Sequence, residues 1–192
     1  MIFRSFFTHR IASMETKRLK LIPACLERAE EAHQAVVRSQ KTLEVYLPWV
    51  PHVLTLEAMI EGTEKAIANF ENFEEELRYY IIEKESDRLL GAVGLMIRDP
   101  DVPSFEIGYW LDDAAVGNGY VAEAVLEVER YAFDDLGAKR IAIHADSTNQ
   151  KSRAVAERCG YEFEGELRNE RLTTSGELSN TVIYSKIREE AA

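Results

Sequence analysis

The chain has 192 residues, of which 46% are hydrophobic and 30% are charged. This is the composition of a globular protein, and the length predicts one domain over residues 1–192, with residues 1–14 as an extended arm. The formal net charge of -11 excludes nucleic acid as an expected partner, because affinity for nucleic acid depends on Lys and Arg that neutralise phosphates. The charge suits a cationic partner, and the alternative is that it serves solubility alone.

The first half of the chain combines a short strand with helical patterns. Leu19 and Leu21 alternate with basic residues ahead of Pro23, which indicates a strand. Apolar residues recur at helical spacing after Thr55, whose hydroxyl suits a helix N-cap. The predicted elements are a strand at 18–22, a helix at 26–38, an irregular loop at 43–51 and a helix that begins after Thr55 and includes Phe70.

The second half consists mainly of strands. Turn-forming residues separate the first three strands, which indicates an antiparallel meander. Gly137 and Gly160 each follow a helical pattern, as glycine does at helix ends. The predicted elements are strands at 78–83, 89–97 and 104–111, a helix at 120–136, a strand at 140–145, a helix at 149–159 and strands at 162–172 and 181–187. This order predicts an α+β fold in which helices cover both faces of a mixed sheet.

Two glycines in alternate positions, Gly117 and Gly119, lie between a predicted strand and the predicted helix 120–136. The first turn of a helix has N–H groups without intrahelical partners and carries about half a positive charge from the macrodipole. Because glycine lets the backbone approach a ligand, this turn is suited to bind a phosphate or pyrophosphate. A plain tight turn and a nucleotide-binding module are alternatives, although the Gly-Lys-Ser/Thr ending of a P-loop and the third glycine of a dinucleotide site are missing.

A second motif, at residues 149–161, closely follows the predicted strand that ends at Ala145. Together with the stretches 106–111 and 117–120, it resembles the GNAT superfamily of N-acetyltransferases, and within it the Rim-type subgroup that acetylates ribosomal-protein N-termini. The resemblance extends from about Thr16 to Ile187. It implies the GNAT fold, a mixed and mostly antiparallel central sheet with splayed central strands that hold acetyl-CoA.

The resemblance also implies how acetyl-CoA binds. The family's phosphate-binding pattern, Gln/Arg-x-x-Gly-x-Gly/Ala, falls on residues 116–121, where Gly119 keeps the central glycine and Val116 and Val121 depart from the pattern. We therefore expect main-chain amides to hold the pyrophosphate. Asn149 matches an asparagine that binds the pantetheine arm, and it is equally suited to cap the following helix. The expected cofactor-binding residues are Tyr109, Trp110, Leu111, Val116, Gly117, Asn118, Gly119, Tyr120, Val121, Ala122, Asn149 and Ser152.

Acetyl transfer from a thioester to an amine requires a proton for the departing thiolate. Many GNAT members supply it from a tyrosine seven residues beyond the asparagine, but that position is Ala156 here. The Rim-type resemblance implies a serine three residues beyond the asparagine instead, which is Ser152. Asn149 and Ser152 would share one helix face. A serine in a first helical turn also commonly serves only as a hydrogen-bonding group of the helix end.

A base that deprotonates the acceptor ammonium stays open among several groups. Glu106 is a carboxylate on a predicted inner strand, which is unusual unless the group is paired or functional. Glu170 lies near the position that the resemblance gives to the Rim-type base. His144 is a third candidate, because imidazoles titrate near neutral pH, and a chain of water molecules is a fourth. We rank Glu106 first, then Glu170, then His144.

Aromatic residues in the loop 43–51 are expected on the acceptor side. Tyr46 and Trp49 flank a proline, and the resemblance implies that they bind the acceptor, although the same side chains can anchor the loop to the core. We also expect a basic cluster near the cofactor tail, where one member would meet the 3′-phosphate. Its members are Lys139, Arg140, Arg153 and Arg158.

These observations predict an acetyl-CoA-dependent N-acetyltransferase that passes acetyl directly to a primary amine in a ternary complex. The expected acceptor is a protein N-terminal amine, with a polyamine or an aminoglycoside as the small-amine alternative. A non-catalytic acyl-CoA-binding or sensing domain is a rival of another class. No apolar run approaches the roughly 20 residues that span a bilayer. Cys25 and Cys159 have no metal-ligand spacing, so we expect a cytoplasmic protein without a metal, and the resemblance implies a homodimer.

Overall fold

The computed structural model describes residues 13–188. Most of the expected arm, residues 1–14, therefore lies outside the described residues. Its last residue, Met14, belongs to β1 (Met14–Glu15), pairs with Leu21 of β2 (Leu19–Pro23) and is buried. The arm thus ends by adding a short strand to the edge of the sheet.

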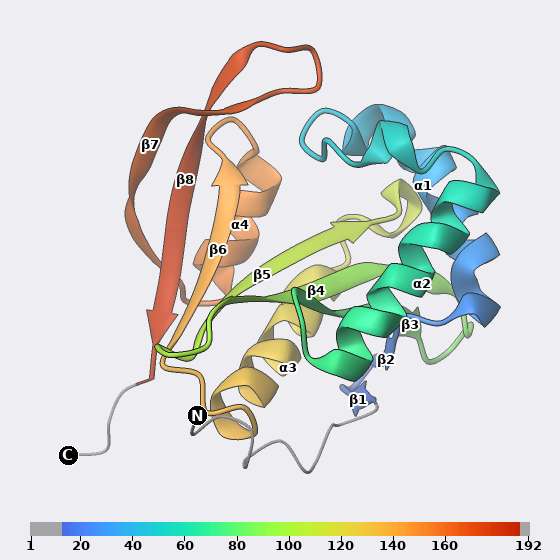
Figure 1. Ribbon diagram of the computed structural model, residues 1–192, viewed down its shortest axis with the longest axis horizontal. Coiled ribbons are helices and arrows are strands. Elements are labelled where there is room, and N and C mark those ends of the chain that lie inside the picture. The colour runs from blue at the N-terminus through green and yellow to red at the C-terminus, as the bar shows by residue number, and fades with distance from the viewer. Residues whose placement is uncertain (1–12, 189–192) are drawn as a thin grey trace.

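An eight-stranded sheet forms the centre of the described chain, in the order β1-β2-β3-β4-β5-β6-β8-β7 (Figure 1). Neighbouring strands pair antiparallel, except β5 and β6, which run parallel. This confirms the predicted mixed, mostly antiparallel sheet. The other strands are β3 (Glu76–Glu83), β4 (Leu89–Asp99), β5 (Ser104–Leu111), β6 (Arg140–Asp146), β7 (Glu162–Leu172) and β8 (Leu178–Ile187).

Helices cover both faces of this sheet, as predicted. α1 (Ala29–Leu43) and α2 (Leu56–Asn72) lie on one face, and α3 (Tyr120–Asp134) and α4 (Gln150–Arg158) on the other (Figure 1). Three short 3-10 turns complete the fold: η2 (Leu26–Arg28), η3 (Val50–His52) and η4 (Asp113–Ala115). None of the helices within residues 13–188 has both the length and the apolar character needed to cross a membrane.

The alternation of side chains along each strand divides the core into two halves. On β3, Tyr80 and Ile82 join the buried cluster under α1 and α2, whereas Tyr79 and Ile81 join the cluster under α3. Because both faces are covered, β3 and β4 are apolar at nearly every position rather than at every second one. The sheet is thus a rigid partition between two faces, and residues on its central strands can be assigned to one face or the other.

Several element ends differ from the prediction by a few residues, and three of them have a clear physical reason. α1 continues past residue 38, since Ser39 and Leu43 are also buried. α3 ends at Asp134, ahead of the predicted end at 136, and the chain then turns through Gly137 at a φ of 68°. β8 begins at Leu178 rather than at 181, because the hairpin with β7 stays paired nearly to its tip.

β5 and β6 separate along their length, and this separation positions the candidate site. Their pairing extends only over residues 104–106 of β5 and 140–142 of β6. In contrast, β5 stays paired with β4 as far as Leu111, which lies opposite Gly91. The two strands therefore diverge toward their carboxyl ends (Figure 1), which confirms the predicted splay.

Candidate active site

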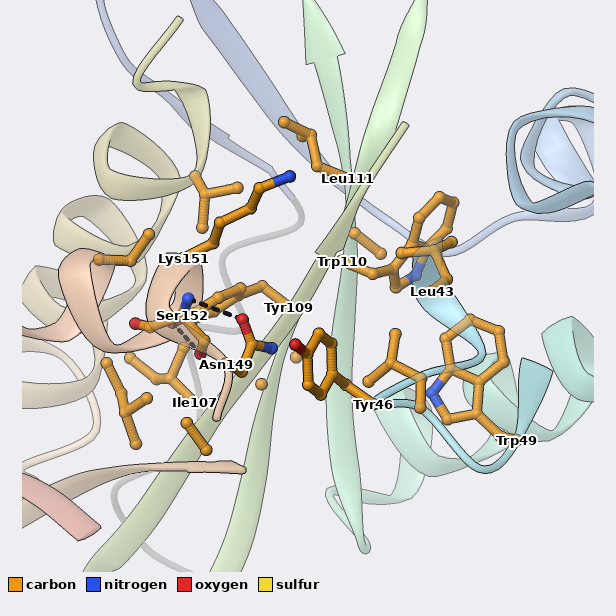
Figure 2. A pocket seen from close by; sticks show the side chains of 18 of the residues that line it. Leu43, Tyr46, Trp49, Ile107, Tyr109, Trp110, Leu111, Asn149, Lys151 and Ser152 are labelled. Atoms are coloured by element: carbon orange, nitrogen blue, oxygen red, sulfur yellow. Dashed lines mark hydrogen bonds between the residues drawn. The ribbon is translucent and has the colours of Figure 1, made fainter. Parts of the chain in front are cut away.

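A cleft of about 1090 Å³ opens where β5 and β6 separate (Figure 2). The carboxyl ends of these strands, the loop between β5 and α3, and one face of α4 line one side of the cleft. The segment between α1 and α2 and parts of β3 and β4 line the other side. Every cofactor-binding residue expected from the sequence contributes to this lining, as do Tyr46 and Trp49. The structure therefore gathers residues that are far apart in the chain around one space large enough for an extended ligand.

The loop between β5 and α3 presents main-chain donors to the cleft. Gly117 and Gly119 have φ angles of 91° and 76°, which favour glycine, and Gly119 is the N-cap of α3. Within residues 13–188, the amides from 117 to 122 have no hydrogen-bond acceptor. A Cβ on either glycine would have no described neighbour closer than 3.8 Å. Glycine is thus required here for the backbone angle, and the turn leaves several N–H groups free for an anion.

Asp112 holds the start of this loop against α1. It is 1% exposed, and its carboxylate accepts from the Ala114 amide at 3.1 Å, from Arg38 Nη2 at 2.7 Å and from Ser39 Oγ at 3.3 Å. Burial by itself raises the pKa of Asp112, but these hydrogen bonds outweigh burial and lower the pKa. An ionised side chain therefore fixes the path of the chain just before the glycine turn.

Beyond its pairing with β6, β5 has a free edge that faces the cleft. The Asp112 amide donates to the Leu90 carbonyl of β4 at 2.7 Å, so the main-chain groups of Trp110 also point toward β4. By alternation, the N–H and C=O groups of Tyr109 and Leu111 point toward β6 and the cleft. These are the residues expected to pair with a pantetheine arm.

Asn149, Ser152 and Tyr109 form one hydrogen-bonded group at the start of α4 (Figure 2). Asn149 Oδ1 accepts from the Ser152 amide at 3.1 Å as the helix N-cap, and its Nδ2 has no partner among the described residues. The Tyr109 hydroxyl lies 2.9 Å from Ser152 Oγ and 3.1 Å from the Ser152 carbonyl oxygen, to which it can donate. Burial raises the pKa of Tyr109 to about 12, against the opposing effect of the Ser152 hydrogen bond. Two neutral hydroxyls therefore lie side by side and can donate a proton.

Two cationic side chains reach the cleft from α4. Lys151 and Arg158 line it, and Figure 2 shows Lys151 extending from the helix into the cleft. Neither side chain has an ion-pair partner in the part of the chain that the structure describes. Of the expected basic cluster, Arg158 alone lines the cleft among the described residues. Lys139 precedes β6 and Arg140 is its first residue, at the strand end that is not part of the cleft lining. Arg153 points instead to Tyr184, because α4 presents only one face to the cleft.

The aromatic side of the cleft comes from the segment between α1 and α2. Trp49 packs edge-on against Trp110, with 6.2 Å between ring centroids, and so anchors this segment to the core. Tyr46 points into the cleft from the same segment (Figure 2). Arg171 of β7 lines the cleft and donates to the Tyr46 carbonyl at 2.8 Å. This contact joins the β7–β8 hairpin to the segment between α1 and α2.

The candidate bases occupy different positions. Glu106 lines the cleft, is 8% exposed, and accepts from Arg98 Nε at 3.0 Å through Oε2. His144 also lines the cleft, with Nδ1 3.2 Å from the same oxygen. Glu170 is not part of the described cleft lining, and its carboxylate accepts from Thr181 Oγ1 at 2.6 Å within the hairpin. The structure therefore brings Glu106 and His144 together and leaves Glu170 apart from them.

A comparison with protein-family models decides the family. The model of the acetyltransferase (GNAT) domain matches residues 18–162. The chain belongs to the GNAT acetyltransferase family. The matched region contains β5, the glycine turn and α4, and with them every residue that the sequence analysis assigned to acetyl-CoA.

Individual relatives agree with this GNAT assignment. A Bacillus subtilis protein named "Putative ribosomal N-acetyltransferase YdaF" is 30% identical over 166 residues, which cover 84% of this chain and 87% of that protein. Among solved structures, the microcin C7 self-immunity acetyltransferase MccE, in complex with acetyl-CoA and AMP, has a TM-score of 0.85 at 25% identity and covers 93% of this chain and 98% of its own. RimL, a ribosomal L7/L12 alpha-N-protein acetyltransferase in complex with coenzyme A, has a TM-score of 0.83 at 23% identity, with coverages of 90% and 95%. The GNAT fold and the Rim-type resemblance are therefore confirmed.

Three features of this GNAT site were not found from the sequence. Lys151 could have been found, because it lies seven residues before Arg158 and so on the same helix face. The hydroxyl contact between Tyr109 and Ser152 joins residues 43 apart and has no local signal. Arg171 lines the cleft in place of the expected Glu170, because the register of β7 shifts at a bulge before Arg171.

Within residues 13–188, no group of His, Cys, Asp and Glu has the arrangement of a metal site.

Proposed function

We propose that this GNAT enzyme transfers acetyl from acetyl-CoA directly to the N-terminal amine of a protein in a ternary complex. The observation that supports this most strongly is a continuous cleft at the separation of β5 and β6, with anion-binding amides and Ser152 on one side and Tyr46 and Trp49 on the other. Such a cleft can admit two substrates from opposite sides. The names of YdaF and RimL, both of which refer to ribosomal acetylation, favour a protein amine over a small one.

The residues of the cleft fit acetyl-CoA, which would supply an activated acetyl thioester. The free amides of residues 117–122 suit its diphosphate, and Lys151 and Arg158 add positive charge nearby. The outward main-chain groups of Tyr109 and Leu111 suit the amides of the pantetheine arm. Main-chain binding is well matched to an enzyme whose net charge of -11 would otherwise repel an anionic ligand.

Direct transfer agrees with the nucleophiles that are present. No cysteine lines the cleft among the described residues, and burial raises the pKa of Cys159 to about 11, so this thiol stays protonated. Ser152 is hydrogen-bonded to Tyr109 rather than to an imidazole that would activate it for attack. In our proposal Ser152 therefore acts as the proton donor to the departing thiolate, with Tyr109 holding its hydroxyl in place.

The test is thiol release from acetyl-CoA with four acceptors. These are a ten-residue peptide with a free N-terminal serine, the same peptide with a blocked N-terminus, spermidine and kanamycin. We expect release with the free peptide alone and an acetyl group on its N-terminus by mass spectrometry. Turnover of spermidine or kanamycin without the peptide would replace the proposed acceptor by a small amine. Coenzyme binding without turnover of any acceptor would instead support the sensing domain.

The proton-donor role has its own test. Ser152→Ala should lower kcat by about 100-fold, in the range expected for the loss of a general acid, and leave coenzyme A affinity unchanged. Ser86→Ala, in the turn between β3 and β4 and away from the cleft, is the matched control. Initial rates at varied concentrations of both substrates should give intersecting lines, since parallel lines would indicate a covalent acetyl-enzyme.

A further inference from the structure

Arg98 and His144 both approach one oxygen of a buried carboxylate beside the cleft. Oε2 of Glu106 lies 3.0 Å from Arg98 Nε, 2.9 Å from Arg98 Nη2 and 3.2 Å from His144 Nδ1. Glu106 itself is 8% exposed. The Arg98 guanidinium forms an ion pair with this carboxylate. Glu106 is therefore better placed to hold the histidine than to take up a proton from an acceptor.

The approach of Glu106 to Nδ1 bears on which nitrogen of the His144 ring carries the proton. An ionised carboxylate accepts hydrogen bonds and cannot donate one, so a carboxylate oxygen 3.2 Å from Nδ1 favours the tautomer with the proton on Nδ1. In the neutral ring, Nε2 then has a free lone pair. Within residues 13–188 no hydrogen bond or ion pair involves Nε2. The side chain is 38% exposed and lines the cleft, so Nε2 is available to a ligand.

The position of His144 in the sheet suits a base on the acceptor side. It lies two residues beyond Ala142, the last residue of β6 that pairs with β5, and so just past the point where the strands part. By alternation it faces the same side of the sheet as Ala142 and its partner Glu106, and that is the side of Trp110, Trp49 and α1. Ser152 and Tyr109 lie with α4 on the opposite face. The two proton-transfer groups would therefore flank the cleft from opposite faces of the sheet.

We propose that His144 is the general base of this enzyme, with Nε2 taking a proton from the acceptor ammonium while Glu106 fixes the ring and stabilises its charged form. This inference rests on the proposed acetyl transfer. The ammonium gives one proton to Nε2, which later passes it to solvent. The neutral amine forms the N–C bond as the C–S bond breaks, and the sulfur leaves with the electron pair. Sulfur takes the Ser152 hydroxyl proton, and the second amine proton, lost as the amide forms, restores that hydroxyl through water.

The charges around the ring set the direction of the pH dependence. Glu106 favours the imidazolium and Arg98 opposes it. Glu164 of β7 is also close enough to interact with the ring, and its pKa is lowered to about 2, mainly by Arg140, so this carboxylate stays ionised as well. A protonated ring cannot accept a proton, so activity should fall as pH falls. Charged side chains on the surrounding strands include Arg98 of β4, Glu106 of β5, Arg140 and Asp146 of β6, Glu164 and Arg171 of β7, and Lys186 of β8.

The first test needs no acceptor. Long-range proton–nitrogen correlation spectra of the ¹⁵N-labelled protein report which ring nitrogen of each histidine is protonated. The chain has 4 histidines, and the signals missing in His144→Gln identify that residue. We expect the neutral His144 ring to carry its proton on Nδ1 above about pH 7. In Glu106→Gln the ring should lose this preference for Nδ1. A ring protonated at Nε2 in the neutral form would refute the inference, whatever the activity of the enzyme.

The second test uses acetyl-CoA with the free N-terminal serine peptide. For the wild type, kcat/KM should decrease as the pH is lowered from about 8 to about 5, the interval in which imidazoles titrate. This decrease is the acidic limb of the pH profile. His144→Ala should lower kcat by about 100-fold or more, lack this limb and regain activity with added imidazole. Glu106→Gln should keep the limb but move it to lower pH, because the imidazolium has lost a stabilising charge. A purely structural role for His144 predicts neither the lost limb nor the rescue.

Controls separate this inference from the proposed function. His33 lies outside the cleft, with Nε2 3.0 Å from the Leu54 carbonyl oxygen, so His33→Gln should leave the pH profile unchanged. Coenzyme A affinity and Tm of His144→Ala should match those of the wild type. If the wild type released no thiol with any acceptor, the proposed function would fail and the spectra would still decide the tautomer. If the wild type were active and His144→Ala kept its rate and its acidic limb, only the assignment of the base would fail.

Discussion

Replacing Gly119 with alanine tests whether the backbone of the turn between β5 and α3 makes the coenzyme site. Gly119 has a φ of 76°, and Arg18 Nη2, at 3.8 Å, would be the nearest described neighbour of an added Cβ. The cost is therefore conformational rather than steric. An L-residue in the left-handed region costs about 1–2 kcal/mol. For a chain of this length, that free energy lowers Tm by roughly 2–8 °C.

If the turn relaxes in the variant, the conformational cost of the alanine lowers coenzyme A affinity instead of the stability of the fold. Should the backbone of the Gly119→Ala variant escape the strain by leaving the left-handed region, the amides would no longer converge, and coenzyme A affinity should fall by a factor of about 5–30. Scanning fluorimetry and calorimetric titration with coenzyme A measure the two effects. The opposite control is Gly62→Ala within α2, where an added Cβ meets no described atom within 4 Å and alanine should stabilise the helix by about 0.5–1 kcal/mol. If Gly119→Ala changed neither Tm nor affinity, main-chain binding of the diphosphate at this turn would be refuted.

Three further substitutions address other parts of the site. Gly91→Ala should destabilise the fold by more than about 3 kcal/mol, because its Cβ would lie 2.1 Å from a carbonyl oxygen of β5. Gly165→Ala is the control and should leave the free energy of unfolding nearly unchanged, because open space surrounds Gly165. Urea denaturation of the two variants measures the difference. Asp112→Asn should lose about 1–3 kcal/mol at pH 7 by weakening the contact with Arg38. Because the folded pKa of Asp112 is lowered, its contribution is present above about pH 4 and lost as pH falls further, so the two proteins should converge in acid-denaturation curves. Tyr109→Phe should lower kcat by about 5- to 10-fold with an unchanged KM for acetyl-CoA, since the contacts of its hydroxyl with Ser152 are lost. An unaltered kcat would show that Ser152 needs no such support.

Much of the fold could be predicted from local patterns. Thr55 caps α2 by accepting from the Ala58 amide at 3.2 Å, as its place before a helical run indicated. The strands 104–111 and 162–172 have the predicted bounds, since turn-forming residues limit them on both sides. The end of α1 could not be predicted in the same way, because buried Ser39 makes its side-chain hydrogen bonds with Asp112 and Asp113, which are 73 and 74 residues away in the chain.

The features of the site also separate into those set by nearby residues and those set by contacts between distant parts of the chain. The turn at Gly117 and Gly119 and the Asn149 helix cap could be predicted because they depend on neighbours within a few residues. Ser152 was assigned from the GNAT resemblance, and its role as proton donor stays a prediction. The preference for Glu106 over His144 as the base came from the place of this carboxylate on an inner strand, and our proposal reverses it from the contacts of the two side chains. Glu170 lies within the register shift between Leu167 and Arg171, and this irregularity leaves Arg171 rather than Glu170 in the cleft lining.

The sequence by itself determined the α+β element order, the glycine turn that opens α3 and the asparagine cap of α4, because these depend on backbone angles and hydrogen bonds between residues close in the chain. Only the tertiary structure decided how β5 parts from β6, that Tyr109 meets Ser152 across 43 residues, and that Arg98 and His144 share one oxygen of Glu106. Such contacts depend on the register of strands from distant parts of the chain. Strand register is set by the packing of the whole sheet, and no short stretch of residues contains it.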